Sequence, residues 1–193
     1  MLVYRVFPYD PAASPGEPGH PDYLYLPAQG GMRLGNPHHY LAWYYGATPE
    51  VAIGESFANH SQWSEEMFEA PFLDAGRRVL GVFEIDDDVE LRDMDDAQTL
   101  VEMSLRPTQV VSRARAVTQK WALRVYQERR QHDGERLWRG VRWWSFHRPH
   151  WTVYGLWTGR AESPPHRLVT TEALHKNHPA VEAARKSLQK PWH

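Results

Sequence analysis

The amino-acid sequence predicts a mixed α+β fold in a single domain that spans residues 1–193. Short apolar segments and helical segments follow one another without the regular strand–helix repeats of a parallel sheet. We therefore expect mixed, mostly antiparallel sheets flanked by helices. A chain of 193 residues is long enough for one domain with a substantial core. Trp, Tyr and Phe make up 12% of the chain, and these rings either build that core or line a pocket.

The first elements are a strand and a long loop. Leu2–Phe7 is a short apolar run with Arg5 inside it and predicts a strand. Residues 8–29 are rich in Pro, Gly and Ala and predict a loop that is long enough to act as a lid. Alternating residues at 23–26 are compatible with a short strand within this loop. The aromatic segment His39–Ala47 fits a strand or a helix, and its ring content favours the strand.

A helix is expected from Thr48 to about Asn59. Thr48 is a good N-cap, a proline follows in the first turn, and Glu50 lies near the positive end of the helix dipole. At 100° per residue, Glu55 falls inside the apolar arc of this helix. A lone acid that faces the interior costs stability unless it is paired or placed for a task. A structural ion pair with an arginine and a catalytic role are both open for Glu55.

The remaining elements follow in order along the chain. Strands are expected at 77–85, 89–92, 137–146, 151–158 and 167–170, and helices at 112–130 and 177–190. A short helix that ends near Met103 is expected to start at Asp95 or Asp96, and Pro107 predicts a break after it. The acidic segment 85–96 and the basic residues of the 112–130 helix are expected to be solvated surface. Docking of an acidic partner on that basic helix is the alternative.

Composition and motifs exclude several classes of protein. The net charge of −2 and pI of about 6.6 lack the basic footprint of direct nucleic-acid binding. The absence of cysteine excludes disulfides, thiolate metal sites and a cysteine nucleophile. We see no secretion signal and no apolar run of membrane-spanning length, so the expected location is the cytoplasm. The sequence has no HExxH, GxSxG, phosphate-binding GxxxxGK[ST] or dinucleotide-binding GxGxxG pattern, and no metal site is expected.

A set of polar residues lies among the aromatic segments. Each has an ordinary structural explanation, such as a core tyrosine or a serine at a strand end. The set comprises Arg5, Arg33, Tyr44, Tyr45, Glu55 and Ser145.

In its motifs the chain resembles the RES-domain family, the toxin half of Xre–RES toxin–antitoxin systems. The matching segments are YRV at 4–6, GGMRLGNP at 30–37, YYGATPEVAIGE at 44–55 and GVRWWS at 140–145. The family's arginine, tyrosine, glutamate and serine then fall on Arg33, Tyr44, Glu55 and Ser145, with Arg5 as a further arginine. Met32 separates the glycines from Arg33, and the doubled tyrosine leaves Tyr44 and Tyr45 as alternatives.

The resemblance implies an ADP-ribosyltransferase-like fold and NAD⁺ as substrate. Cleavage of the nicotinamide–ribose bond builds positive charge on the ribose, which a carboxylate such as Glu55 stabilises. Arg5 and Arg33 would bind the pyrophosphate, Tyr44 or Tyr45 would stack on the nicotinamide, and Ser145 would hydrogen-bond the ribose or amide.

The resemblance also implies a partner, an Xre-type helix-turn-helix antitoxin that blocks the pocket. The acceptor of the ADP-ribose (water, phosphate or a protein) and the oligomeric state are open. The alternative from another class is a catalytically inactive module that binds an NAD-like ligand or a protein.

Overall fold

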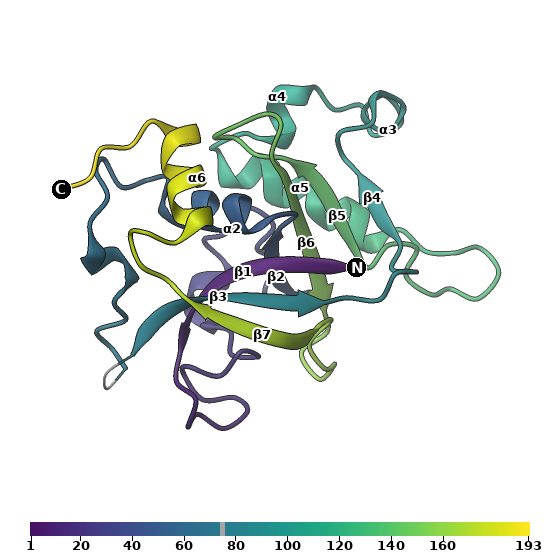
Figure 1. Cartoon of the computed structure of the whole chain (residues 1–193). Helices are drawn as coiled ribbons and strands as arrows, with labels where there is room; N and C mark the ends of the chain where they lie inside the picture. The colour runs from purple at the N-terminus through teal and green to yellow at the C-terminus, as the bar shows by residue number, and fades with distance from the viewer. Residues whose placement is uncertain (74–75) are drawn as a thin grey trace. The chain divides into compact units, whose positions relative to one another are not determined.

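The computed structural model describes residues 1–73 and 76–193. The strands are β1 (Leu2–Tyr9), β2 (Leu41–Gly46), β3 (Arg77–Glu84), β4 (Leu91–Asp93), β5 (Gly140–Trp144), β6 (Thr152–Thr158) and β7 (Arg167–Ala173). The helices are α1 (Leu26–Gln29), α2 (Pro49–Phe57), α3 (Ala97–Glu102), α4 (Pro107–Val110), α5 (Arg115–Gln127) and α6 (Pro179–Leu188), with a 3₁₀ turn η1 at Glu65–Phe68. Figure 1 labels these elements along the chain.

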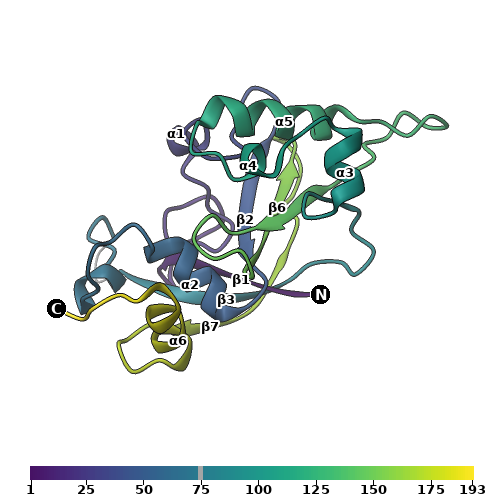
Figure 2. The same cartoon turned by 90° about the horizontal axis from the view of Figure 1, so that it is seen from above.

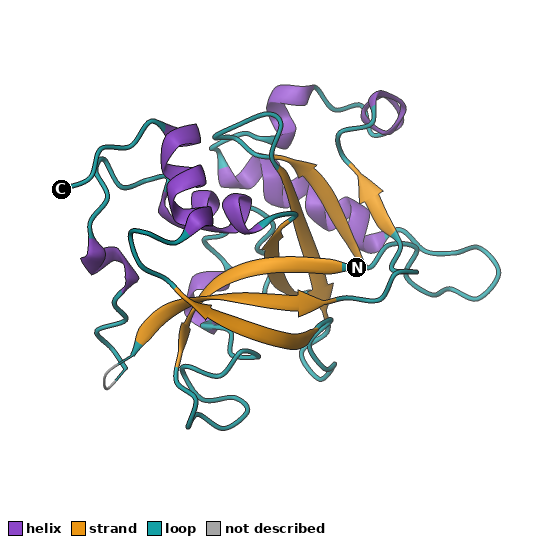
Figure 3. Ribbon diagram, in the orientation of Figure 1, coloured by secondary structure: helices purple, strands orange, loops and turns teal. Residues whose placement is uncertain are grey.

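The strands hydrogen-bond in the order β4-β5-β6-β2-β1-β3-β7. Pairs β1–β2, β1–β3, β3–β7 and β5–β6 are antiparallel, whereas β4 and β5 run parallel. Helices and strands follow one another irregularly along the chain, and Figure 3 shows both kinds of element in the fold. The expected α+β class with a mostly antiparallel sheet is confirmed.

The chain divides into two compact units, which we describe one at a time. The first unit comprises Met1–Tyr25, Tyr45–Ile85 and His166–His193, and the second comprises Leu26–Tyr44 and Asp86–Pro165. Strand β2 contributes its first residues to the second unit and its last ones to the first.

In the first unit, β1, β3 and β7 carry α2 and α6 on one face (Figure 1). Tyr4 and Val6 of β1 pack against the core that these helices complete. Side chains alternate along a strand, so Arg5 leaves β1 from the opposite face. That face also carries Phe7 and Phe83, whose ring centroids are 5.8 Å apart. The buried core residues beside the helices are Ala52, Ile53, Phe57, Trp63, Met67, Phe68, Leu80, Leu174, Val181 and Ala184.

In the second unit, α5 forms the longest helix and packs against α4 (Figure 2). The buried indole of Trp121 in α5 donates to the Gln109 carbonyl of α4 at 3.3 Å. Gln119 of α5 donates to the carbonyl oxygens of Gly30 and Met32 at 2.8 and 2.9 Å. The longest helix therefore holds the Gly-Gly turn in place.

The observed element boundaries confirm most of the expected strands and helices. Segment 39–47 contains a strand, β2, as its ring content favoured. Thr48 caps α2 as predicted, accepting from the Val51 N–H at 3.3 Å, and Asp96 caps α3, accepting from Thr99 at 2.7 Å. The predicted helix at 112–130 is shorter, as α5, and its N-terminal part is not helical. The helix expected at 177–190 is α6, and His178 provides its N-cap.

The expected short strand at 23–26 is wrong, because the chain forms α1 from Leu26 instead. Pro27 suits the first turn of a helix. The buried Gln29 side chain then bonds both backbone groups of Ala42, accepting from its N–H at 2.8 Å and donating to its carbonyl at 3.2 Å. Pro107 also begins a helix, α4, where only a break was expected.

Among the described residues, none of the helices combines the length and apolar character needed to cross a membrane.

Candidate functional site

The two units divide the candidate residues between them. Arg5, Tyr45 and Glu55 belong to the first unit, and Arg33, Tyr44 and Ser145 belong to the second. That both sets serve one site stays a prediction of the sequence.

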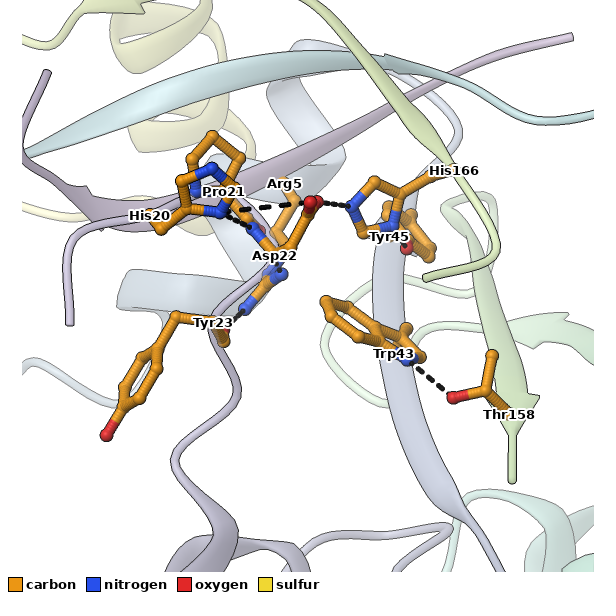
Figure 4. Close-up of polar contacts among 9 residues, drawn as sticks. All are labelled: Arg5, His20, Pro21, Asp22, Tyr23, Trp43, Tyr45, Thr158 and His166. Carbon is orange, nitrogen blue, oxygen red and sulfur yellow. Dashed lines mark hydrogen bonds and ion pairs between the residues drawn. The ribbon is translucent and has the colours of Figure 1, made fainter. Parts of the chain in front are cut away.

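Arg5 is half-buried and held by the segment that follows the first loop. Its two terminal nitrogens donate to the Pro21 and Tyr23 carbonyl oxygens, each at 3.4 Å (Figure 4). The guanidinium carbon lies 5.8 Å from the centre of the Phe7 ring. Burial lowers the pKa of Arg5, while Tyr45 and Asp22 act in the opposite direction. Backbone oxygens and a neighbouring ring thus orient the arginine.

A hydrogen-bonded chain lies next to Arg5 and links Tyr45, His166 and Asp22. The Tyr45 hydroxyl is 2.5 Å from His166 Nδ1, and His166 Nε2 is 3.0 Å from an Asp22 carboxylate oxygen (Figure 4). The His166 ring also packs edge-on against Phe83, with ring centroids 4.6 Å apart. Tyr45 itself is only 2% exposed, so its ring is a packed core group.

Burial, neighbouring charges and hydrogen-bond geometry determine which atoms of the Tyr45–His166–Asp22 network carry protons. Burial lowers the pKa of His166 to about 4, and the charge of Arg5 acts in the same direction, while Asp22 opposes them. The ring is therefore neutral at pH 7 and carries one N–H. Because a carboxylate only accepts, that hydrogen is on Nε2, and Nδ1 accepts from the Tyr45 hydroxyl. Burial also raises the pKa of Tyr45, so the hydroxyl keeps its proton.

Glu55 lies in the last turn of α2 and is half-buried. The buried residues of the helix are Val51, Ala52, Ile53, Gly54 and Phe57. Glu55 thus lies at the edge of the buried face, where the sequence predicted a position inside the apolar arc. The residue is therefore not fully removed from solvent, which a group that acts on a ligand requires.

In the second unit, a tight turn brings Arg33 and Tyr44 together. The Tyr44 hydroxyl accepts from the Leu34 N–H at 2.8 Å, and the charges of Arg33 and Arg115 favour ionised tyrosine. Burial is the larger effect and raises the Tyr44 pKa. Arg33 Nη1 donates to the carbonyl oxygens of Ser112 at 2.9 Å and Val110 at 3.4 Å.

One glycine of this turn is required by a close approach of the backbone. A Cβ at Gly35 would overlap with the Gln29 carbonyl oxygen, so only glycine fits at this position. At Gly30, by contrast, a Cβ would meet nothing nearer than 3.8 Å. Gly35 therefore fixes the path of the backbone from which Arg33 and Leu34 extend.

Ser145 follows β5 and is 1% exposed. Its hydroxyl oxygen accepts from the backbone N–H groups of His147 at 2.9 Å and Arg148 at 3.4 Å. These bonds shape the turn into β6, so Ser145 has a structural role at this position in addition to any contact with a ligand.

His166 and Asp22 were not among the residues that the sequence singled out. Asp22 lies in a loop rich in turn residues, and His166 follows two prolines just before β7. Nothing in their local patterns differs from solvated loop residues, so only the folded structure reveals the pair. In the part of the chain that the structure describes, no group of three or more His, Asp or Glu is arranged to hold a metal ion.

The fold and motifs define an α+β protein with polar candidate residues in each of its two units. The RES domain family matches residues 3–180, so the chain belongs to the RES-domain family, as the motifs predicted. A search of curated proteins found no match. The fold is similar to a chain of the M. tuberculosis MbcT–MbcA toxin–antitoxin complex, with a TM-score of 0.56 and 12% identity. The similarity covers 98% of this chain and 89% of that one, and at this identity it supports the fold.

Proposed function

We propose that this chain is the toxin of a type II toxin–antitoxin pair that cleaves NAD⁺ in the cytoplasm. The bond between ribose C1′ and the nicotinamide nitrogen breaks, and its electron pair leaves with nicotinamide. Glu55 stabilises the positive charge that develops on the ribose. The acceptor is water, phosphate or a protein side chain. Water or a protonated side chain loses a proton as it bonds to C1′, whereas an anionic phosphate oxygen bonds directly.

The observation that carries the proposal is membership of the RES-domain family over residues 3–180 together with a half-buried Glu55. Arg5 and Arg33 are the candidate pyrophosphate ligands, since guanidinium matches phosphate oxygens in pairs. Tyr44, which is less buried than Tyr45, is the better candidate for stacking on nicotinamide. Ser145 is the candidate hydrogen-bond partner of the ribose or amide.

Nicotinamide release from NAD⁺ by the purified chain tests this function, with and without phosphate and candidate acceptor proteins. We expect release by the wild type and a loss of about a hundredfold or more in Glu55→Gln, because the charge that stabilises the transition state is removed. Glu66→Gln, an exposed acid on η1 in the same unit, is the matched control. No release by the wild type would contradict the function, and equal turnover by Glu55→Gln would refute the role of Glu55.

We also propose an Xre-type antitoxin as the partner that blocks the pocket. The similar M. tuberculosis structure is a toxin–antitoxin complex, which supports an antitoxin as the partner; the Xre type is implied by the family resemblance. Co-expression with the product of the neighbouring gene, followed by size-exclusion chromatography with light scattering, tests the complex and gives the oligomeric state. Undiminished nicotinamide release from a saturated complex would contradict blocking of the pocket.

A catalytically inactive binding module is the second candidate. It is favoured by the contacts of Arg33, whose Nη1 donates to two backbone carbonyl oxygens of the same unit. Calorimetric binding of NAD⁺ without any released nicotinamide would support this alternative.

A further inference from the structure

The hydrogen-bonded chain Tyr45–His166–Asp22 ends on the short segment that holds Arg5. The two carbonyl groups that accept from Arg5 belong to Pro21 and Tyr23, on either side of Asp22. The Asp22 carboxylate, in turn, bonds His166 at 3.0 Å. Each residue of this network belongs to the first unit.

Hydrogen bonds and ring packing hold the His166 side chain. Tyr45 of β2 bonds Nδ1, Asp22 bonds Nε2, and the Phe83 ring of β3 packs against the imidazole. The His166 side chain is 0% exposed, whereas Asp22 is 37% exposed. A buried anchor therefore holds the partly exposed loop that carries the carbonyl groups.

Charged and titratable groups from three elements of the first unit face His166. Arg5 from β1 is positive, Asp22 from the loop is negative, and Tyr45 from β2 is neutral. His20 joins from the loop, where its Nδ1 accepts from the Asp22 N–H at 3.1 Å. The Pro21 and Tyr23 carbonyl groups orient the guanidinium by hydrogen bonds.

We propose that His166, oriented by Asp22, is a positioning residue for Arg5 and fixes its guanidinium for the pyrophosphate of the substrate. Loss of the His166–Asp22 bond releases the segment 21–23, and the two carbonyl groups then no longer define the direction of the guanidinium. The substrate is the one named under the proposed function, and this inference rests on that function. Small errors in the placement of a binding group weaken binding strongly.

The first unit supplies a matched control. His178 and Glu172 form a second histidine–carboxylate pair, with the same 3.0 Å distance between Nε2 and the carboxylate oxygen. His178 is 9% exposed, and its Nδ1 accepts from the Ala180 N–H at the start of α6. This pair caps a helix and does not hold the segment 21–23. Variants of the pair therefore show how much loss of a histidine–carboxylate hydrogen bond affects substrate binding when Arg5 is not involved.

The test compares His166→Leu and Asp22→Ala, which cannot form this hydrogen bond, with His178→Leu and Glu172→Ala. For the first two variants we expect the KM for NAD⁺ to rise about tenfold while kcat changes little, because Arg5 acts in binding. The control variants should keep the wild-type KM. A KM that is equal in the His166 or Asp22 variants and in the controls would overturn the inference. Asp22→Ala removes a side chain that is 37% exposed, so it carries the test if His166→Leu does not fold.

A binding measurement separates this inference from the proposed function. ADP-ribose, which retains the pyrophosphate, is titrated calorimetrically into each protein. About tenfold weaker binding by His166→Leu and Asp22→Ala, with wild-type binding by the controls, supports the positioning role even if no variant releases nicotinamide. Equal ADP-ribose binding by the wild type and Asp22→Ala, or no binding by the wild type, overturns it even if NAD⁺ is cleaved.

Discussion

Lowering the pH should reduce the unfolding free energy of the protein, because the folded state disfavours protonation of His166. The histidine side chain is 0% exposed, and burial, assisted by the Arg5 charge, lowers its pKa from 6.5 to about 4. In the unfolded chain the ring has an ordinary pKa of about 6.5. Between these two values the unfolded chain binds a proton that the folded chain does not. Stability therefore falls as the pH is lowered from about 6.5 to about 4 and is unaffected by this group above that window.

The magnitude follows from the difference between the two pKa values. At about 1.4 kcal/mol per pKa unit, titration of His166 between pH 7 and pH 4 costs about 3 kcal/mol of unfolding free energy. That is a large part of the stability of an ordinary domain. Asp22 favours the charged ring and so raises the His166 pKa, but burial and the Arg5 charge lower it by more.

Urea unfolding at pH 7, 5.5 and 4 measures the effect in the wild type, in His166→Gln and in His178→Gln. His166→Gln removes the titrating group, so the wild type should lose about 3 kcal/mol more than this variant between pH 7 and pH 4. His178→Gln should lose stability in parallel with the wild type. Parallel curves for the wild type and His166→Gln would refute a neutral, buried His166 held beside Arg5.

Three further changes test local packing. Gly81→Ala should lower the unfolding free energy by about 1–3 kcal/mol, because the new Cβ would lie 2.5 Å from the Phe83 ring and 2.7 Å from the Phe7 ring. Thermal unfolding measures the loss, and Gly30→Ala is the control, because its Cβ would meet nothing nearer than 3.8 Å. Thr48→Ala should cost about 1 kcal/mol in urea unfolding through the lost α2 cap, and Thr48→Ser should restore most of it. Ser145→Ala should cost about 1–2 kcal/mol, since the His147 and Arg148 N–H groups lose their acceptor, and unchanged stability would contradict the structural role of the hydroxyl.

Much of the fold can be predicted from local sequence because its signals are local. Apolar runs with β-branched and aromatic residues predict β1 and β3, and Thr48 and Asp96 mark the starts of α2 and α3. Contacts across the chain cannot be read in this way. The Gln29 side chain bonds Ala42, 13 residues further on, and so stabilises α1 at the end of a segment whose alternation favoured a strand.

At the candidate site, too, local sequence does not reveal contacts between residues that are far apart in the chain. Residue types and motifs selected Arg5, Tyr45 and Glu55, but not the groups that determine their environment. Tyr45 bonds a histidine 121 residues away, and that histidine bonds Asp22 at a separation of 144 residues. One sequence without its folded structure offers no reason to connect these positions.

The two adjacent tyrosines of β2 face different partners, and this has a consequence for insertions and deletions. Tyr44 bonds the backbone of Leu34, whereas Tyr45 bonds His166. Because side chains alternate, a one-residue slip of β2 moves each residue into its neighbour's place. A slip in one direction would put Tyr45 in the Tyr44 position and Gly46 in the Tyr45 position. A slip in the other would put Tyr44 in the Tyr45 position and Trp43 in the Tyr44 position. Either slip preserves one tyrosine contact and loses the other, so the length of this strand is constrained from both faces.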